Sequence, residues 1–253
     1  MSADILLSVR NLTVRFGGLV AVRDLSFDVR RGAIHALIGP NGAGKSTTFN
    51  CISRFYNPSS GSIFFEGQDI TRRKGSQMAE LGIARTFQNL ELFNELSVLE
   101  NVILGTYARS ARRWSDLLRR PQAPVREFAE HLLERVGLVD FRHHAANGLD
   151  FGRQKMLELA RALAVQPTLL LLDEPAAGLR NREIDKLDSI LTELSSKDGV
   201  TVLLVEHVMQ LVMAISERIT VMSFGEQIAE GTPREVRSDP RVIEAYLGKG
   251  EQS

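Results

Sequence analysis

The sequence contains very little cysteine and no excess of charge. Cys51 is the single cysteine among 253 residues, so an internal disulfide framework is excluded and the composition fits a reducing compartment. Lys plus Arg and Asp plus Glu both number 31, so the composition lacks the basic excess typical of nucleic-acid-binding proteins. We therefore expect no nucleic acid among the partners of this chain.

Long hydrophobic runs are also missing. The longest are short stretches such as LLLL at 169–172 and VLLV at 202–205, far below the roughly 20 apolar residues of a membrane-spanning helix. The first residues lack the basic and then apolar pattern of a secretory signal peptide. We therefore expect a soluble protein that reaches a membrane only through a partner, and the two apolar runs are typical of buried parallel strands.

What the sequence does contain is a regular alternation of strand-like and helix-like segments. Strands are expected at 5–16, 25–29, 33–39, 61–67, 83–88, 168–175, 201–207 and 218–223. Helices are expected at 45–52, 98–108, 114–120, 125–138, 181–196 and 208–216. The alternation predicts one α/β domain over 1–253 with a mostly parallel sheet. Because helical patterns dominate its middle, we place a helical subdomain at 91–160, between core segments 1–90 and 161–253.

The segment GPNGAGKS, from Gly39 to Ser46, matches the phosphate-binding pattern G-x-x-x-x-G-K-[ST] at every fixed position. It lies between an apolar strand and a helix, which is the context that this pattern requires. Its glycines let consecutive backbone N–H groups face one anion, Lys45 places a charge at the β- and γ-phosphates, and Ser46 offers a hydroxyl to Mg²⁺. The sequence therefore predicts binding of a nucleoside triphosphate with Mg²⁺. The candidate contacts are Gly39, Pro40, Asn41, Gly42, Ala43, Gly44, Lys45, Ser46 and Thr47.

A pair of adjacent acids ends the apolar segment LLLLDE. Side chains alternate along a strand, so Asp173 and Glu174 point in different directions and suit two different roles. We expect Asp173 to serve as a Mg²⁺ ligand and Glu174 to polarise the attacking water. Without such roles, two charges at the end of so apolar a strand would be costly.

The segment LDFGRQK, residues 149–155, stands where a helix is expected to begin. One interpretation is a capped helix, with Asp150 as its N-cap and apolar residues following at helical spacing. The other is an anion site, because a helix start carries free N–H groups and a partial positive charge, here beside Arg153 and Lys155. The segment by itself leaves both open.

Six elements together resemble those of the ATP-binding cassette (ABC) ATPases, in the order of that family and over nearly the full length. They are Phe16 before the phosphate loop, GPNGAGKST, Gln88 in RTFQN, the signature position LDFGRQ, the acidic strand LLLLDEP, and His207 in VEHV. The phosphate loop alone would admit many families. The ordered set, with a helical insertion between Gln88 and the acidic strand, is far more specific.

This resemblance implies a fold and a set of residue roles. The fold would be a P-loop NTPase (RecA-like) core with an N-terminal antiparallel β region and an inserted α-helical subdomain. Phe16 would stack on adenine with Val22 beside it, and His207 would contact the γ-phosphate. The implied catalytic residues are Glu174, His207, Gln88 and Lys45, and the implied Mg²⁺ ligands are Ser46, Gln88 and Asp173. Taken singly, Phe16 or His207 is as typical of a packed core as of a ligand site, and only their joint occurrence favours these roles.

The signature segment of this family contacts ATP that a second subunit holds. The implied residues of this contact are Leu149, Asp150, Phe151, Gly152, Arg153 and Gln154. The usual motif is LSGGQ, so Asp150 replaces a serine. A carboxylate near a γ-phosphate should weaken closure unless Arg153 offsets its charge or Asp150 caps its own helix. Arg180 likewise stands where the family often has an aspartate.

Several longer segments resemble one branch, the ATPases of branched-chain amino-acid importers. They are RFGGLVAV, GIARTFQNLELF, DEPAAGL, EHVMQLVM and the ending GTPREVRSDPRVIEAYLG. The resemblance implies a peripheral ATPase at the cytoplasmic face of the inner (plasma) membrane, working with a second ABC ATPase in a homo- or heterodimer, transmembrane permeases and a substrate-binding protein. Urea or amide importers and the lipopolysaccharide-export ATPase are near alternatives. A soluble ABC protein is a further one, although such proteins usually carry two cassettes or a long coiled coil.

An arginine-rich stretch at 109–126 is the one notable feature outside these motifs. It holds six arginines around Trp114 and two leucines. A solvated basic helix and a surface facing a membrane or a permease both remain open for it.

Overall fold

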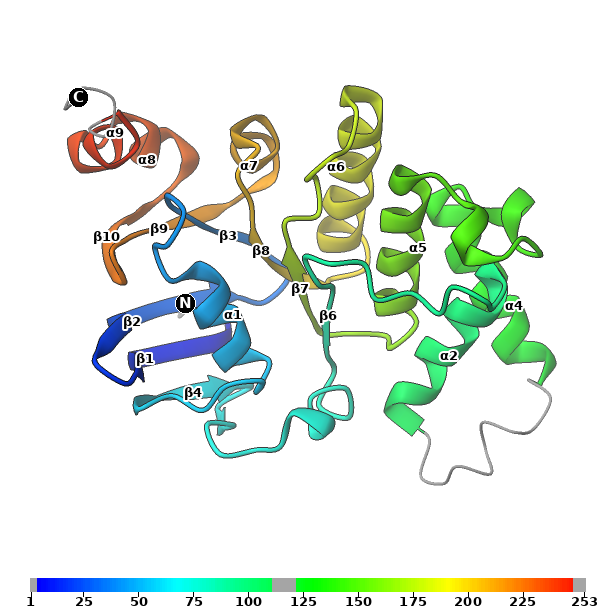
Figure 1. Cartoon of the computed structure of the whole chain (residues 1–253), viewed down its shortest axis with the longest axis horizontal. Helices are drawn as coiled ribbons and strands as arrows, with labels where there is room; N and C mark the ends of the chain where they lie inside the picture. Colours follow the sequence, from blue (N-terminus) through cyan, green and yellow to red (C-terminus); the bar gives the residue numbers. More distant parts are fainter. Residues whose placement is uncertain (1–3, 111–121, 248–253) are drawn as a thin grey trace.

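The structure, a computed structural model, describes residues 4–110 and 122–247 and is built around two β-sheets (Figure 1). Its strands are β1 (Ile5–Phe16), β2 (Leu19–Arg30), β3 (Ile34–Ile38), β4 (Ser60–Phe65), β5 (Gln68–Asp69), β6 (Ile83–Arg85), β7 (Leu169–Asp173), β8 (Thr201–Val205), β9 (Arg218–Ser223) and β10 (Glu226–Gly231). Its helices are α1 (Lys45–Ile52), α2 (Val98–Ser110), α4 (Ala123–Val136), α5 (Phe151–Leu163), α6 (Asn181–Ser196), α7 (Met209–Ile215), α8 (Pro233–Ser238) and α9 (Pro240–Leu247). Short 3₁₀ turns lie at Gly75–Gln77, Val139–Phe141 and Ala146–Gly148.

The central sheet has the strand order β10-β9-β3-β8-β7-β6. All its neighbours pair in parallel except β10, which pairs antiparallel with β9 at the edge. Every residue of β3, β7 and β8 is buried, as expected for strands with both faces covered. The predicted parallel sheet and the buried character of the two apolar runs are confirmed.

The second sheet is antiparallel, with the order β2-β1-β4-β5. Its β1–β2 hairpin turns at Gly17 and Gly18, where Phe16 pairs with Leu19. The expectation of a strand at 25–29 was too short, because pairing with β1 extends β2 back to Leu19. The N-terminal antiparallel region is confirmed, and α1 lies between this sheet and the central one (Figure 1).

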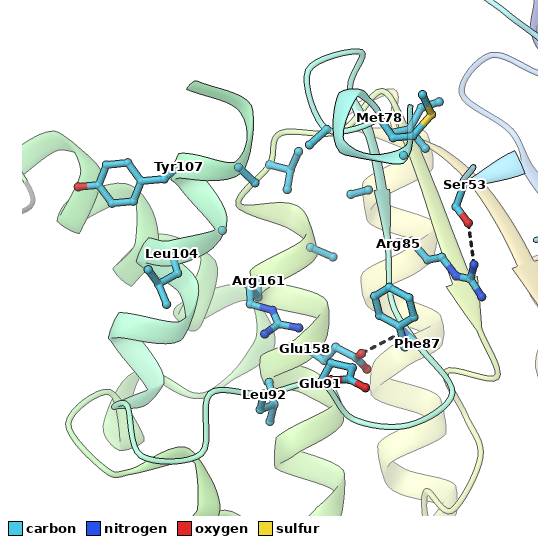
Figure 2. Close-up of a pocket in the computed structure, with 18 of the residues that line it drawn as sticks. Ser53, Met78, Arg85, Phe87, Glu91, Leu92, Leu104, Tyr107, Glu158 and Arg161 are labelled. Atoms are coloured by element: carbon cyan, nitrogen blue, oxygen red, sulfur yellow. Dashed lines mark hydrogen bonds between the residues drawn. The ribbon is translucent and has the colours of Figure 1, made fainter. Parts of the chain in front are cut away.

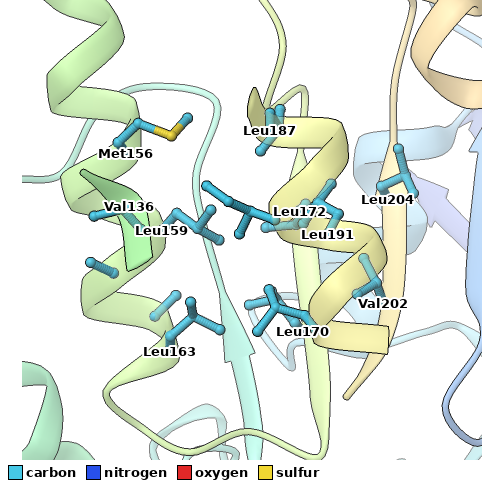
Figure 3. Close-up of a cluster of buried hydrophobic side chains, with 14 of the residues drawn as sticks. Val136, Met156, Leu159, Leu163, Leu170, Leu172, Leu187, Leu191, Val202 and Leu204 are labelled. Carbon is cyan, nitrogen blue, oxygen red and sulfur yellow. The ribbon is translucent and has the colours of Figure 1, made fainter. Parts of the chain in front are cut away.

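Two buried clusters hold these layers together, one on each face of the central sheet. Alternate residues of β7 enter different clusters: Leu170 and Leu172 pack with the helices, while Leu169 and Leu171 face α1 and the antiparallel sheet. Figure 3 shows the helical side of this core, with residues of α4 and α5 facing β7 and α6. Because successive side chains of a strand point to opposite faces, β7 contributes to both clusters and so connects the two halves of the molecule.

Helices α2, α4 and α5 form the helical subdomain at one end of the sheet (Figure 1). The segment predicted as a helix at 98–108 is α2, and the one predicted at 125–138 is α4, which ends earlier because Gly137 adopts φ 69° at its C-cap. The predicted helix at 114–120 lies outside the described residues. The proposed subdomain boundary at 160 falls inside α5, which continues to Leu163 because its apolar face packs on the core. Within the described ranges, no helix is both long and apolar enough to cross a membrane.

The segment after β6 leaves the sheet early. The strand expected at 83–88 ends at Arg85. The Thr86 N–H still donates to the Leu171 carbonyl of β7 at 3.0 Å, but the next N–H, that of Phe87, donates to the Glu158 side chain instead. Residues 87–93 then form an open connection to the helical subdomain. This connection carries Gln88, one of the predicted site residues.

Candidate active site

The phosphate loop connects β3 to α1, and two of its glycines are required by their surroundings. Gly39 has φ 149°, and a Cβ atom built there would lie 2.1 Å from the Met222 carbonyl oxygen of β9. Gly44 has φ 98°, and its Cβ would lie 2.6 Å from the Ala21 carbonyl oxygen of β2. Backbone atoms cannot yield as a flexible side chain can. The loop is therefore pressed against both sheets, which sets the start of α1.

An open cavity of about 610 Å³ lies over this loop. Its lining residues are Phe16, Leu19, Val20, Ala21, Asn41, Gly42, Ala43, Gly44, Lys45, Ser46, Thr47, Gln88, Glu174, His207 and Phe224. Five predicted site residues from distant segments therefore meet here: Phe16, Lys45, Gln88, Glu174 and His207. Four lining residues were not predicted: Leu19, Val20 and Ala21 at the start of β2, and Phe224 in the turn between β9 and β10. The local sequence does not mark them as site residues.

Phe16 and Val22, the two predicted adenine contacts, have different positions. Phe16 is about half exposed at the cavity and meets Tyr56 edge to face, with ring centroids 5.5 Å apart. Val22 is fully buried and is not among the lining residues. This placement argues against a direct contact of Val22 with a base, because the side chain packs beneath the loop, 3.2 Å from where a Cβ atom on Gly44 would lie. Its neighbours Val20 and Ala21 line the cavity instead.

Lys45 lies almost fully buried at the first turn of α1. Its Nζ donates to the carbonyl oxygens of Gly39 at 2.8 Å and Pro40 at 3.0 Å, so it ties the start of the loop to its end. Burial lowers the pKa of Lys45, and the nearby carboxylates of Glu174 and Asp173 oppose that shift. The ammonium is thus a partly desolvated cation in the floor of the cavity, a position that suits an anion.

Glu174 is held from two sides at the carboxyl end of β7. His207 Nε2 lies 2.9 Å from Oε1, and Gln88 Nε2 donates to Oε2 at 3.2 Å. Glu174 itself has φ 50°, a left-handed conformation that is uncommon for a residue other than glycine and is often found at functional sites. The three predicted residues therefore form one hydrogen-bonded group at the cavity, with a carboxylate at its centre.

Lys155 completes the surroundings of Glu174, and we did not predict this contact. Its Nζ donates to the Glu174 backbone carbonyl at 3.3 Å and lies 5.8 Å from the centre of the Phe151 ring. The side chain is almost fully buried. The signature helix thus reaches the acidic strand of its own subunit, a contact that depends on the packing of α5 against β7.

Asp173 points away from Glu174, as strand alternation predicted. Its Oδ2 accepts from Arg85 Nη2 at 2.8 Å in an ion pair that is almost wholly buried. Burial raises the pKa of Asp173, and the Arg85 guanidinium opposes that rise. Its other oxygen, Oδ1, is buried without a hydrogen-bond partner. Such an orphaned carboxylate oxygen is a suitable position for a metal ligand.

The donor set fits Mg²⁺. Asp173 offers a carboxylate, Ser46 a hydroxyl and Gln88 an amide oxygen, and Mg²⁺ prefers oxygen ligands and commonly takes only one or two carboxylates besides phosphate and water. Ser46 and Gln88 line the cavity. No cluster of three or more His, Cys, Asp or Glu suited to a metal occurs in the described part of the chain.

The signature segment begins α5 and lines no part of this cavity. Asp150 is the N-cap: its Oδ1 accepts from the Arg153 N–H at 2.9 Å, and its other oxygen forms an ion pair with the Arg153 guanidinium. The predicted cap is confirmed. Arg153 also stacks on Phe141, 4.4 Å from the ring centre. The carboxylate of Asp150 therefore both caps its own helix and is paired with Arg153, the two arrangements that we expected to offset its charge.

The remaining signature residues show how tightly this helix start is packed. Leu149 is buried, Phe151 is about half exposed, and the Gln154 amide donates to the Ala146 carbonyl at 3.4 Å. A Cβ atom on Gly152 would lie 2.2 Å from Glu183 Oε1, a residue in the first turn of α6. Glu183 in turn accepts from the Arg180 N–H at 2.7 Å, so Arg180 is positioned by its backbone rather than by an ion pair.

Most of the arginine-rich stretch lies outside the described residues. Arg126 is within them and pairs with Glu130 one helical turn later at 3.1 Å, with Arg126 exposed and Glu130 partly exposed. Such a pair is typical of a solvated helix face.

Comparisons with known proteins identify the family to which this fold belongs. A family model described as ABC transporter matches residues 22–177, and one described as branched-chain amino acid ATP-binding cassette transporter matches 226–252. A solved ATP-binding cassette in its ADP conformation superposes with a TM-score of 0.86 at 32% identity, covering 96% of this chain and 99% of that one. A nucleotide-free cassette superposes with a TM-score of 0.85 at 31% identity and the same coverage.

Two relatives carry the match over the whole length. The high-affinity branched-chain amino acid transport ATP-binding protein LivG of Salmonella typhimurium is 44% identical over 250 residues, covering 96% of this chain and 98% of the relative. The corresponding protein BraF of Pseudomonas aeruginosa is 42% identical with the same coverage. The resemblance and the fold that it implied are confirmed. This chain belongs to the ABC transporter family, as an ATP-binding cassette related to the branched-chain amino acid transport ATP-binding proteins.

Proposed function

We propose that this chain is the ATP-hydrolysing subunit of an ABC importer and couples ATP binding and hydrolysis to the uptake of branched-chain or related amino acids. The observation that carries the hydrolytic part is the position of Glu174. Its carboxylate lies at the cavity over the phosphate loop, held by Gln88 and His207 on opposite oxygens. A carboxylate oriented in this way can accept a proton from an attacking water.

The other residues would then bind and orient the nucleotide. The loop N–H groups and Lys45 would hold the β- and γ-phosphates, and Phe16 would stack on the base. Ser46, Asp173 and Gln88 would hold Mg²⁺, which neutralises developing charge on the phosphates. His207 would orient Glu174 and reach the γ-phosphate from the same side. Each of these residues acts by position and charge, as phosphoryl transfer requires.

A second cavity supports a permease as partner. It has a volume of about 950 Å³ and lies between the core and the helical subdomain (Figure 2). Phe87 lines this cavity, whereas the next residue, Gln88, lines the nucleotide cavity. A segment of a membrane subunit that docked beside Phe87 would therefore move Gln88 and with it Glu174. The lining includes Glu91 and Arg161, which would be available for polar contacts, whereas the buried Glu158 accepts the Phe87 N–H at 3.0 Å.

A second cassette is supported by the signature segment. Residues 149–154 lie away from the cavity of their own chain, so they are available to ATP bound by another subunit. Structures of a related cassette at 26% identity, with TM-scores of 0.80 and 0.81, are described as dimeric. A heterodimer and a homodimer would both complete the site in this way.

The proposed identity of the transported solute is supported by the relatives and not by the site. LivG and BraF are named as branched-chain amino acid transport proteins, and the C-terminal match at 226–252 belongs to a family model of the same description. The experiment is transport in proteoliposomes that contain the permeases and the cassettes. We expect ATP hydrolysis to rise when leucine and its binding protein are supplied, and Glu174→Gln to abolish both hydrolysis and uptake. Stimulation by urea or a short amide, but not by leucine, would contradict the proposed solute.

A further inference from the structure

Arg85, the last residue of β6, contacts both the acidic strand and the end of α1. Its Nη2 donates to Asp173 Oδ2 at 2.8 Å, and its Nη1 donates to Asn50 Oδ1 at 2.7 Å and Ser53 Oγ at 2.6 Å. The bond to Ser53 is drawn in Figure 2. The side chain is only 9% exposed. One planar guanidinium therefore connects the predicted metal ligand to the helix that follows the phosphate loop.

Three aromatic rings surround this guanidinium. Its carbon lies 5.1 Å from the ring centre of Phe87, 5.6 Å from that of Phe55 and 5.8 Å from that of Phe49. Phe55 and Phe87 also meet edge to face at 5.5 Å. Cations are attracted to ring faces within about 6 Å, so the rings and the three oxygen acceptors define a single orientation of Arg85. Aromatic contacts and a rigid fork of donors are features that lysine does not reproduce.

The two ends of this arrangement face different parts of the molecule. Arg85, Phe55 and Phe87 line the 950 Å³ cavity between the core and the helical subdomain. Asp173, on the other side, has one carboxylate oxygen bound to Arg85 and the other, Oδ1, buried without a partner. A displacement of the cavity wall would therefore reach the metal ligand through a single side chain.

We propose that Arg85 is a positioning residue for Mg²⁺ binding: it holds Oδ2 of Asp173 so that Oδ1 remains available to the metal, and it makes that position depend on the wall of the intersubdomain cavity. This inference rests on the proposed function in that it takes Asp173 as the metal ligand. It assigns to Arg85 a task that none of the motifs of the phosphate site includes. A purely structural ion pair would stabilise the fold without affecting the metal.

The test separates nucleotide binding from the contribution of the metal. The purified chain is titrated with a non-hydrolysable ATP analogue, once in EDTA and once in Mg²⁺, by calorimetry. For Arg85→Lys we expect affinity in EDTA within about twofold of wild type, because the phosphate loop is untouched. We call the ratio of the affinity in Mg²⁺ to the affinity in EDTA the Mg²⁺ gain. We expect this gain to fall about tenfold in Arg85→Lys, because lysine cannot span Asp173, Asn50 and Ser53 at once.

Arg54→Lys is the matched control. Arg54 is also a buried arginine near the end of α1, but its donors go to Arg73, Tyr56 and Asn57 and not to the acidic strand. We expect the same substitution there to leave the Mg²⁺ gain unchanged. An equal loss of the Mg²⁺ gain in both variants would contradict the proposal, since it would reflect general loosening.

A double-mutant comparison gives a further readout. In an Asp173→Asn background, Arg85→Lys should cause no further loss of the Mg²⁺ gain, because the ligand that Arg85 positions is already altered. Additive losses would overturn the proposal, as would a variant whose melting temperature falls while its Mg²⁺ gain stays at the wild-type value.

A milder variant covers the case in which Arg85→Lys does not fold. Phe87→Leu removes one ring and leaves every donor of Arg85 in place, and we expect it to reduce the Mg²⁺ gain about threefold. An unchanged gain in Phe87→Leu would contradict the link to the cavity wall. Failure of the wild-type chain to bind the analogue under either condition would instead reject the proposed function, so the two failures are distinguishable.

Discussion

His207 Nε2 lies 2.9 Å from Glu174 Oε1, although 33 residues separate them in the sequence. The two are brought together because β7 and β8 are parallel neighbours whose carboxyl ends meet at one edge of the sheet. Gln88 reaches the opposite oxygen of the same carboxylate from the connection after β6, which neighbours β7 on its other side. The orientation of Glu174 therefore depends on the neighbouring carboxyl ends of β6, β7 and β8, which bring the three side chains together.

Glu174→Gln should slow hydrolysis by about 100-fold or more while ATP affinity stays within a few fold of wild type. The amide keeps the size of the side chain and can still bond Gln88 and His207, but it cannot take a proton from water. Turnover in the assembled transporter and equilibrium binding to the purified chain measure the two effects separately. Undiminished steady-state hydrolysis would rule out this role.

Lys45→Met should weaken ATP binding by about 10- to 100-fold, since a charge-assisted contact with phosphate contributes about 1.5–3 kcal/mol. The effect should include some loosening of the loop, because Lys45 also holds the Gly39 and Pro40 carbonyls. Lys197→Met is the control, because Lys197 is an exposed lysine paired only with Glu193 in the described structure. If both variants bind ATP as the wild type does, the assignment of the phosphate loop is wrong.

Gly152→Ala should destabilise the fold by about 1 kcal/mol. The new Cβ would displace Glu183, whose carboxylate bonds the Arg180 N–H at the start of α6, and loss of such a contact at a helix start costs about 0.5–2 kcal/mol. Gly148→Ala is the matched control, because a Cβ atom at that position would meet nothing within 4 Å. Urea unfolding of both variants gives the comparison, and equal midpoints would contradict this account.

Asp150→Ala should cost about 1 kcal/mol of stability, whereas Asp150→Ser should be close to neutral because serine is also a good N-cap. Since the carboxylate is already paired with Arg153, we expect Asp150→Ser to change the ATPase rate at the partner-centred site by less than about threefold. The rate is measured in the assembled complex with one catalytic glutamate disabled at a time. A large gain in rate would show that the charge of Asp150 does oppose closure.

His35 should make the protein less stable in mild acid. It is a buried residue of β3 with Nε2 2.8 Å from Oγ1 of Thr220 in β9, and burial, reinforced by Arg218, lowers its pKa from 6.5 to about 3. The unfolded chain therefore binds a proton below about pH 6.5 that the folded chain does not take up until about pH 3. The contribution of His35 to the free energy of unfolding is therefore fully present above about pH 6.5 and decreases as the pH falls below that value.

A His35→Gln variant isolates that contribution. Between about pH 7.5 and 5.5, the wild type should lose about 1.4 kcal/mol more of its free energy of unfolding than the variant does. Urea unfolding at the two pH values measures both. Parallel pH profiles for wild type and variant would mean that His35 is not held neutral by burial.

Much of the site could be predicted from the sequence because its parts are local. The phosphate loop, the cap at Asp150 and the acids after β7 each depend on a few consecutive residues and on the period of the element that carries them. The parallel sheet followed from apolar runs that only a strand covered on both faces can bury. Strand and helix ends were less accurate, as at β2 and β6, because pairing with a neighbouring strand decides where a strand ends.

The contacts among distant residues were decided only by the tertiary structure. Nothing near Arg85 in the sequence indicates its ion pair with Asp173, 88 residues away, and nothing near Lys155 indicates that it reaches the Glu174 carbonyl. Val22 shows the same limit, since hairpin register places it beneath the loop and its neighbours Val20 and Ala21 at the cavity. Local sequence determines which groups are available for nucleotide chemistry. Packing between segments that are far apart in the chain determines which of those groups meet, because burial and hydrogen bonding are satisfied only once the whole sheet is assembled.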